Sequence, residues 1–92
     1  ETLRSIRGNV NAGGVTFGGA GFTSSRTGTG TYTILFLTSF GAQPSVAVSP
    51  HSTLAAIATV DAITSSSFVV RIFDSNGAAT DRGFSFIAIG IP

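Results

Sequence analysis

The chain has 92 residues, which is enough for one domain with a single modest core. Charged residues make up 10% of it, against about 25% in an average soluble domain, and the net charge of +1 leaves no basic patch that could bind nucleic acid. There are no cysteines, which excludes disulfides and thiolate metal sites, and no apolar run approaches the roughly 18 residues of a membrane span. A lone monomer with so little charge would be poorly protected against association.

The first half of the chain predicts strands, because short runs of β-branched and aromatic residues alternate with Gly, Ser and Thr. Asn11-Ala12-Gly13-Gly14 is expected to form a turn, and Gly18-Gly19 to break a strand. The expected strands here are residues 3–10, 15–17, 21–26 and 31–38.

The second half continues the pattern. Pro50 is expected to end a strand over residues 45–49. The alanines of residues 54–63 fit either a helix or a strand, and we favour a strand because β-branched residues are frequent there. Asn76-Gly77 predicts a tight turn between strands at 68–74 and 83–90.

Seven or eight strands with turn signals about every 8–12 residues predict one all-β domain over residues 1–92. We expect a small antiparallel β-sandwich, jelly-roll-like in its order. One face of three strands should form its core. The expected core residues are Tyr32, Ile34, Phe36, Phe68, Val70, Ile72, Phe84 and Phe86.

The same strands are also apolar on their second face, which a two-sheet sandwich leaves in water. Leaving a large apolar side chain in water forgoes about 1.5–3 kcal/mol, so we expect further copies of the chain to cover this face. The expected interface residues are Leu35, Leu37, Val69, Arg71, Phe73, Ile87 and Ile89.

The sequence offers little support for an enzyme, a cofactor or a metal. Gly28-Thr29-Gly30 lacks the third glycine of a nucleotide loop and leads into a strand. His51, with Ser49 and Ser52 nearby in sequence, has no orienting group that would make it a general base.

The carboxylates are equally unspecific. Asp74 and Asn76 echo the start of a calcium loop, and Asp81 could add a ligand, but the later ligands are missing. Asp61, Asp74 and Asp81 show no spacing that selects a pair for glycoside hydrolysis, and the aspartates are expected to pair with arginines.

A glycan site would lie in the loops, because there is no Trp and most Phe residues are expected in the core. The residues considered for it are Asn9, Asn11, Ser24 to Arg26, His51 and Asn76 to Arg82. Those favoured as ligand-contacting loop residues are Arg26, His51, Asn76, Asp81 and Arg82.

Two segments, RTGTGTYTILF at residues 26–36 and GFSFIAIG at residues 83–90, carry a resemblance. Together with QPSVAVSP and SSSFVVRIFDSNGAATDR they resemble the small β-sandwich domain at the C-terminal ends of phage tail fibres and of bacterial collagen-like or other fibrous surface proteins. The sequence departs from that pattern in Leu35 and Leu37, where small polar residues are expected.

The resemblance implies a homotrimer that caps a viral tail fibre or bacterial surface fibre and contacts a cell-surface glycan or protein receptor. It implies a virion or extracellular location and no enzymatic activity. Because the chain begins with Glu1, we expect it to be the C-terminal fragment of a longer fibrous protein. The alternative is a capsid, decoration or filament subunit that coats a particle by self-association.

Overall fold

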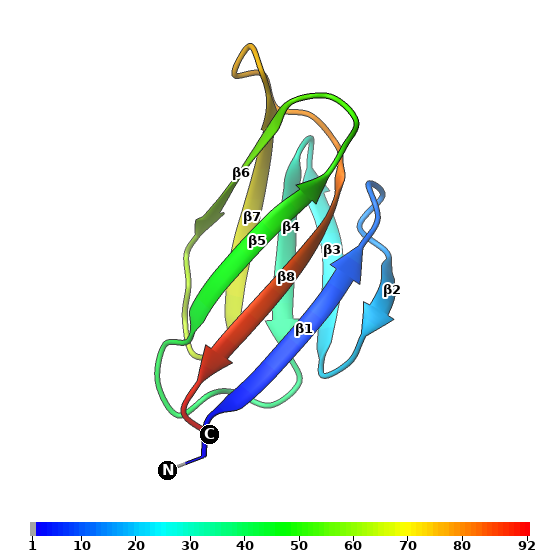
Figure 1. Cartoon of the computed structure of the whole chain (residues 1–92). Coiled ribbons are helices and arrows are strands. Elements are labelled where there is room, and N and C mark those ends of the chain that lie inside the picture. The colour runs from blue at the N-terminus through cyan, green and yellow to red at the C-terminus, as the bar shows by residue number, and fades with distance from the viewer. Residues whose placement is uncertain (1) are drawn as a thin grey trace.

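The computed structural model describes residues 2–92, and these contain eight strands and no helix, so none that could cross a membrane (Figure 1). The strands are β1 (Arg4–Val10), β2 (Thr16–Gly19), β3 (Phe22–Gly28), β4 (Thr31–Phe36), β5 (Ser45–His51), β6 (Ala56–Asp61), β7 (Ser67–Asp74) and β8 (Gly83–Gly90).

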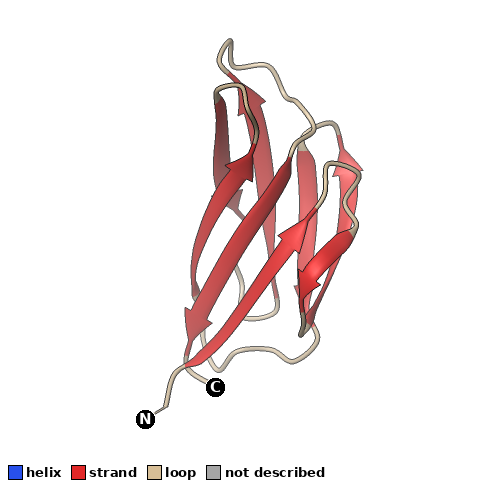
Figure 2. Cartoon of the chain, turned by 45° about the vertical axis from the view of Figure 1, so that its right-hand side comes forward, coloured by secondary structure: helices blue, strands red, loops and turns tan. Residues whose placement is uncertain are grey.

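The strands form two four-stranded antiparallel sheets, ordered β2-β1-β8-β5 and β3-β4-β7-β6, which pack face to face (Figure 2). The all-β class and the expected number of strands are confirmed. The sequence suggests a jelly-roll-like order, but the pairs β1–β2, β3–β4 and β6–β7 keep consecutive strands together within a sheet. The architecture is therefore described simply as two packed antiparallel sheets.

The core lies between the sheets and is rich in phenylalanine. All eight side chains expected in the core are buried, and they are joined there by Ile6, Val10, Phe22, Phe40 and Ala88. Phe86 makes edge-to-face contacts with Phe22 and Phe68, with ring centroids 4.8 and 5.1 Å apart. Such pairs contribute about 0.5–1.5 kcal/mol beyond the burial of their area.

Several expected strand limits are wrong in detail. β5 runs through Pro50 to His51, because β5 is an edge strand and a missing N–H on its free side breaks no ladder bond. β2 includes Gly18 and Gly19, and β4 ends at Phe36. The segment that fitted either helix or strand forms the strand β6.

Gly30 occupies a position that only glycine fits. Its φ angle is +64°, and a Cβ atom there would lie 2.6 Å from the carbonyl oxygen of Ile72. The Gly30 carbonyl in turn accepts a hydrogen bond from the Ile72 N–H. The glycine-rich start of RTGTGTYTILF is thus a turn that packs closely against β7.

The chain termini and several of the connections between strands lie at opposite ends of the sandwich. Both termini lie at one end of the molecule, while the β3–β4 turn, the β5–β6 loop and the β7–β8 connection lie at the opposite end (Figure 1). We call the second end the loop end. A domain held by its termini would present the loop end outward.

Candidate self-association surface

The outer face of the sheet β2-β1-β8-β5 carries exposed isoleucines in its interior. Ile87 and Ile89 point outward from β8, a central strand, and Ile87 is 50% exposed. Their cross-strand neighbours on β5 are small, with Ala47 opposite Ile87 and Ser45 opposite Ile89. On the β1 side Arg7 lies opposite Ile87 and Ser5 opposite Ile89. Small neighbours leave the isoleucines standing above the sheet, where a second surface could bury them.

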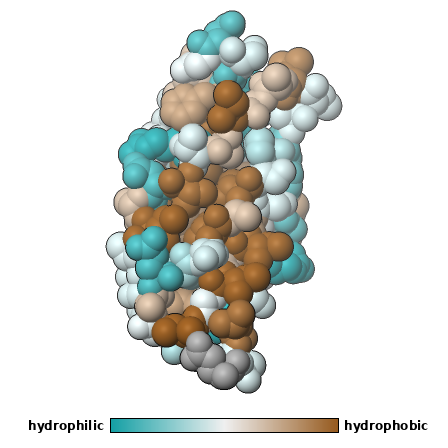
Figure 3. Space-filling model, turned by 60° about the vertical axis from the view of Figure 1, so that its left-hand side comes forward, coloured by the Kyte–Doolittle hydropathy of each residue, from teal (hydrophilic) through white to brown (hydrophobic). Residues whose placement is uncertain are grey.

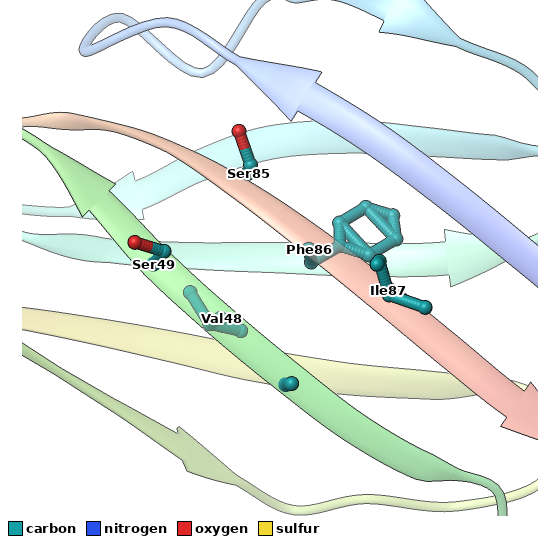
Figure 4. A pocket seen from close by; sticks show the side chains of 6 residues that line it. Val48, Ser49, Ser85, Phe86 and Ile87 are labelled. Carbon is teal, nitrogen blue, oxygen red and sulfur yellow. The ribbon is translucent and has the colours of Figure 1, made fainter.

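Three adjoining hollows run along this face between β5 and β8. The first has a volume of about 190 Å³ and is lined by Ala47, Val48, Ser49, Ser85, Phe86 and Ile87 (Figure 4). The others, of about 330 and 480 Å³, share Ser45 and Ile89, and the last reaches Leu3 and Ile91 near the termini. Among residues 2–92, no charged side chain lines any of the three hollows, so the strip is suited to apolar contact.

The apolar strip continues around the β5 edge of the sandwich. Val46 and Val48 of β5 and Ala58 and Val60 of β6 pack against the core but remain only partly buried. The inward-facing residues of the two edge strands are therefore incompletely covered on this side. Brown side chains gather over a large part of this side in the space-filling view (Figure 3). We call the β5–β8 strip and these edge residues together the β5-side surface.

The expected interface residues do not form one patch. Leu35, Val69, Arg71 and Phe73 point outward from the sheet β3-β4-β7-β6, which faces away from Ile87 and Ile89. Leu37 follows the end of β4 and is exposed. The Arg71 Nε atom lies 3.3 Å from Asp61 Oδ2, which gives this second face an ion pair amid threonines and serines.

The expected ligand residues gather at the loop end, but most of them are engaged within the chain. Arg26 Nε donates to Asp81 Oδ2 at 2.9 Å, and Arg82 Nε donates to Ser52 Oγ at 3.2 Å. The Asp74 carboxylate accepts from the N–H groups of Asn76 and Ala78 at 2.8 and 3.0 Å. These bonds hold turns in place, and within residues 2–92 no cluster of His, Asp and Glu side chains could hold a metal ion.

Asp81, in the segment between β7 and β8, is hydrogen-bonded to the β3–β4 turn. Its Oδ1 atom accepts from the Gly30 N–H at 2.7 Å, while Oδ2 pairs with Arg26. Arg26 and then the Gly30 N–H hold the pKa of this carboxyl below its ordinary value of 3.8. Tyr32, beneath this turn, donates to the Ala12 carbonyl at 2.7 Å, and burial raises its pKa.

We predict that Asp81→Asn lowers the melting temperature at pH 7. A lowered folded-state pKa stabilises the fold above the ordinary pKa, and that stabilisation is lost as the pH falls through the folded-state value. The difference between the two proteins should therefore shrink progressively as the pH falls below 3.8. Thermal unfolding followed by circular dichroism across this range measures it.

Asp61→Asn is the matched control, because its carboxylate also pairs with an arginine but is 57% exposed against 35% for Asp81. Exposed ion pairs contribute little, so this variant should melt close to the parent at every pH. Equal effects of the two substitutions would contradict the assigned role of Asp81.

Neither the family models nor the curated proteins contain a match to the chain.

Sequence reasoning missed two features of these surfaces. Val46 and Val48 show the same alternation as fully buried strand residues, so the sequence does not distinguish them. They are only partly buried because β5 and β6 are edge strands. Phe17, which is not among the expected core residues named above, is 58% exposed. The adjacent Gly18-Gly19 was the available signal, because glycines in a strand accompany bulges.

Proposed function

We propose that the domain is a non-enzymatic structural module that self-associates through the β5-side surface as a homotrimer. The observation that carries this proposal is the continuity of the apolar strip on β5 and β8 with the open β5–β6 edge. Each large apolar side chain that a neighbour covers contributes about 1.5–3 kcal/mol, and association itself costs about 4–15 kcal/mol. Several residues must therefore be buried together, which a continuous surface allows.

The position of this surface supports the proposed ring of three subunits. A closed ring uses two different patches on each subunit, and these must meet at an angle for the ring to close. The β5 and β6 edges lie side by side, one in each sheet. With these edges near the axis, the β5–β8 face of one subunit can contact the β6–β7 side of the next, where Ile57 and Phe73 are cross-strand neighbours.

We further propose that the trimer caps a fibre of a virion or cell surface and takes part in adhesion. The resemblance of residues 26–36 and 83–90 to fibre-end domains supports this. The arrangement of the termini supports it too, because a shaft attached to them would leave the loop end facing outward (Figure 1).

The alternative is a coat or filament subunit. Leu35, Val69 and Phe73 lie on the face opposite Ile87 and Ile89. Contacts between opposite faces do not close into a ring and continue as an open assembly.

Light scattering coupled to size exclusion, performed at micromolar concentrations of the domain, tests both proposals. A stable species of three times the monomer mass is the expected result. A monomer would contradict self-association altogether, whereas large assemblies that grow with concentration would replace the trimer with the coat or filament subunit.

A further inference from the structure

One aromatic and three polar side chains, one from each strand of the sheet β2-β1-β8-β5, meet on its outer face. They are Phe17 of β2, Asn9 of β1, Ser85 of β8 and His51 of β5. The Phe17 and His51 ring centroids are 6.3 Å apart, and hydrogen bonds join the other side chains. We call these four residues the Phe17 cluster.

A β-bulge presents Phe17 to solvent. Asn9 pairs with Gly18 but Val10 pairs with Thr16, so Phe17 is the extra residue on β2. Thr16 instead bonds Ser24 of β3 through the two side-chain oxygens, 2.7 Å apart. Bulges re-aim side chains in this way, and they are frequent beside binding sites. The sequence thus exposes a large apolar ring that a regular strand would have been able to turn into the core.

The polar members form a connected chain. Ser85 Oγ donates its single proton to Asn9 Oδ1 at 2.7 Å, so His51 Nε2, 2.5 Å away, is the donor to Ser85. A nucleophilic serine would instead donate to the histidine, and the arrangement is therefore one for binding. His51 Nδ1 is left as an acceptor and the Asn9 amide nitrogen as a donor.

The four strands of this sheet carry no negative charge, because none of them contains Asp or Glu. The charged side chain that they turn to this outer face is Arg7 of β1, which lies opposite Ile87 and two residues from Asn9. A cationic ligand therefore finds no partner in the cluster. A ligand ring with an apolar C–H face could pack on the exposed Phe17 ring. Hydroxyl groups around the edge of that ligand would match the neutral donor and acceptor of the cluster.

We propose that the Phe17 cluster binds a neutral pyranose sugar. The C–H face of the sugar lies against the Phe17 ring, and its hydroxyls contact His51 Nδ1 and the Asn9 amide nitrogen. The inference rests on the proposed adhesive function, whose receptor class it names. Phe17 lies on β2, the edge strand opposite β5 in the sheet order, while Ser85 and His51 adjoin the β5-side surface. The cluster therefore lies at the border of that surface, with Phe17 on the side away from it.

The test is a titration of the ¹⁵N-labelled domain with methyl pyranosides of glucose, galactose, mannose, N-acetylglucosamine and N-acetylgalactosamine. One sugar ring should bind with a Kd of about 1–10 mM, so each is added to several times that concentration. At least one should shift the amide signals of Asn9, Phe17, Gly18 and Ser85. N-acetylneuraminic acid is the charged comparison, because its carboxylate could pair with Arg7; tighter binding of it than of every neutral pyranoside would reject a neutral ligand.

Phe17→Ala should weaken binding at least about tenfold, and Phe17→Trp should retain it because the aromatic face is kept. Val15→Ala, an exposed apolar truncation in the adjacent turn, should bind as the parent does. His51→Ala should also weaken binding, which tests the cluster without altering β2. The inference is overturned if no pyranoside shifts these amides, if Phe17→Ala binds as well as the parent, or if N-acetylneuraminic acid alone binds.

Light scattering on the same samples separates this inference from the proposed assembly. A trimer that binds none of the sugars rejects the Phe17 cluster and leaves self-association standing. A monomer that binds a sugar through Phe17 supports the cluster and rejects the trimer.

Discussion

Replacing Ile87 with aspartate is expected to convert the assembled domain to folded monomers. Ile87 points outward from a central strand and is 50% exposed in the single chain, so an aspartate there meets water and leaves the core intact. In the assembly the same carboxylate would lose water beside Ala47 on β5 and Arg7 on β1. The cost of desolvating a charge can exceed what pairing with an arginine returns. Association should weaken at least about a hundredfold, as measured by light scattering over a concentration series.

Val15→Asp provides the control for this experiment. Val15 is also exposed, at 62%, but lies in the β1–β2 turn, away from β5 and β6. This variant should keep the mass of the parent. An assembled Ile87→Asp would show that the β5-side surface is not the interface.

The Leu35→Asp variant tests whether the outer face of the sheet β3-β4-β7-β6 contributes to self-association. Leu35 is 51% exposed, which matches Ile87 closely, and it points outward from β4 in the other sheet. Dissociation by both substitutions is expected of a filament whose contacts join the two opposite faces. Dissociation by Ile87→Asp alone would indicate contacts through the β5-side surface only.

Phe68→Ala is expected to be the most destabilising single substitution, with a loss of about 3–5 kcal/mol in the free energy of unfolding. Phe68 is fully buried and packs against Phe36 and Phe86, with ring centroids 5.7 and 5.1 Å away. Removing the ring loses its burial and leaves a cavity between the sheets that the neighbouring rings cannot fill. A domain of this size has about 5–15 kcal/mol in total, so a large part of its stability depends on this side chain.

Denaturant unfolding of the Phe68 variant should be measured in the Ile87→Asp background, because the stability of an oligomer depends on protein concentration. Phe17→Ala is the matched control: the same substitution at an exposed phenylalanine should cost less than about 1 kcal/mol. Similar losses at the two positions would contradict the assignment of Phe68 to the core and Phe17 to the surface.

The strands could be predicted because alternation is a local property. In β4, β7 and β8 the residues expected to face inward are those that the structure buries, since successive side chains of a strand point to opposite faces. The expected strand limits failed at Pro50 and at Gly18-Gly19, where the outcome depends on the neighbouring strand. A proline is tolerated only because β5 is at an edge, and Phe17 is exposed only because β1 and β2 pair with a bulge.

For the candidate surfaces too, some features could be predicted from the sequence and others depend on the tertiary structure. That Leu35, Phe73, Ile87 and Ile89 would face away from the core follows from their spacing, and the low charge indicates that something covers them. That Leu35 and Ile87 lie on opposite sides of the molecule follows from the order of strands, which joins β8 to β1 and β5 but β4 to β3 and β7. Strand order depends on contacts between segments far apart in the chain, and no local pattern records it.

Composition and periodicity alone were sufficient for an all-β chain with one apolar core and a second apolar face on its strands. The pairing of strands placed the open β5–β6 edge beside the β5–β8 strip and brought Asn9, Phe17, His51 and Ser85 together from four strands. The physical reason is that side-chain direction is a property of each strand, whereas a surface or a binding cluster requires residues that only long-range hydrogen bonding brings into contact.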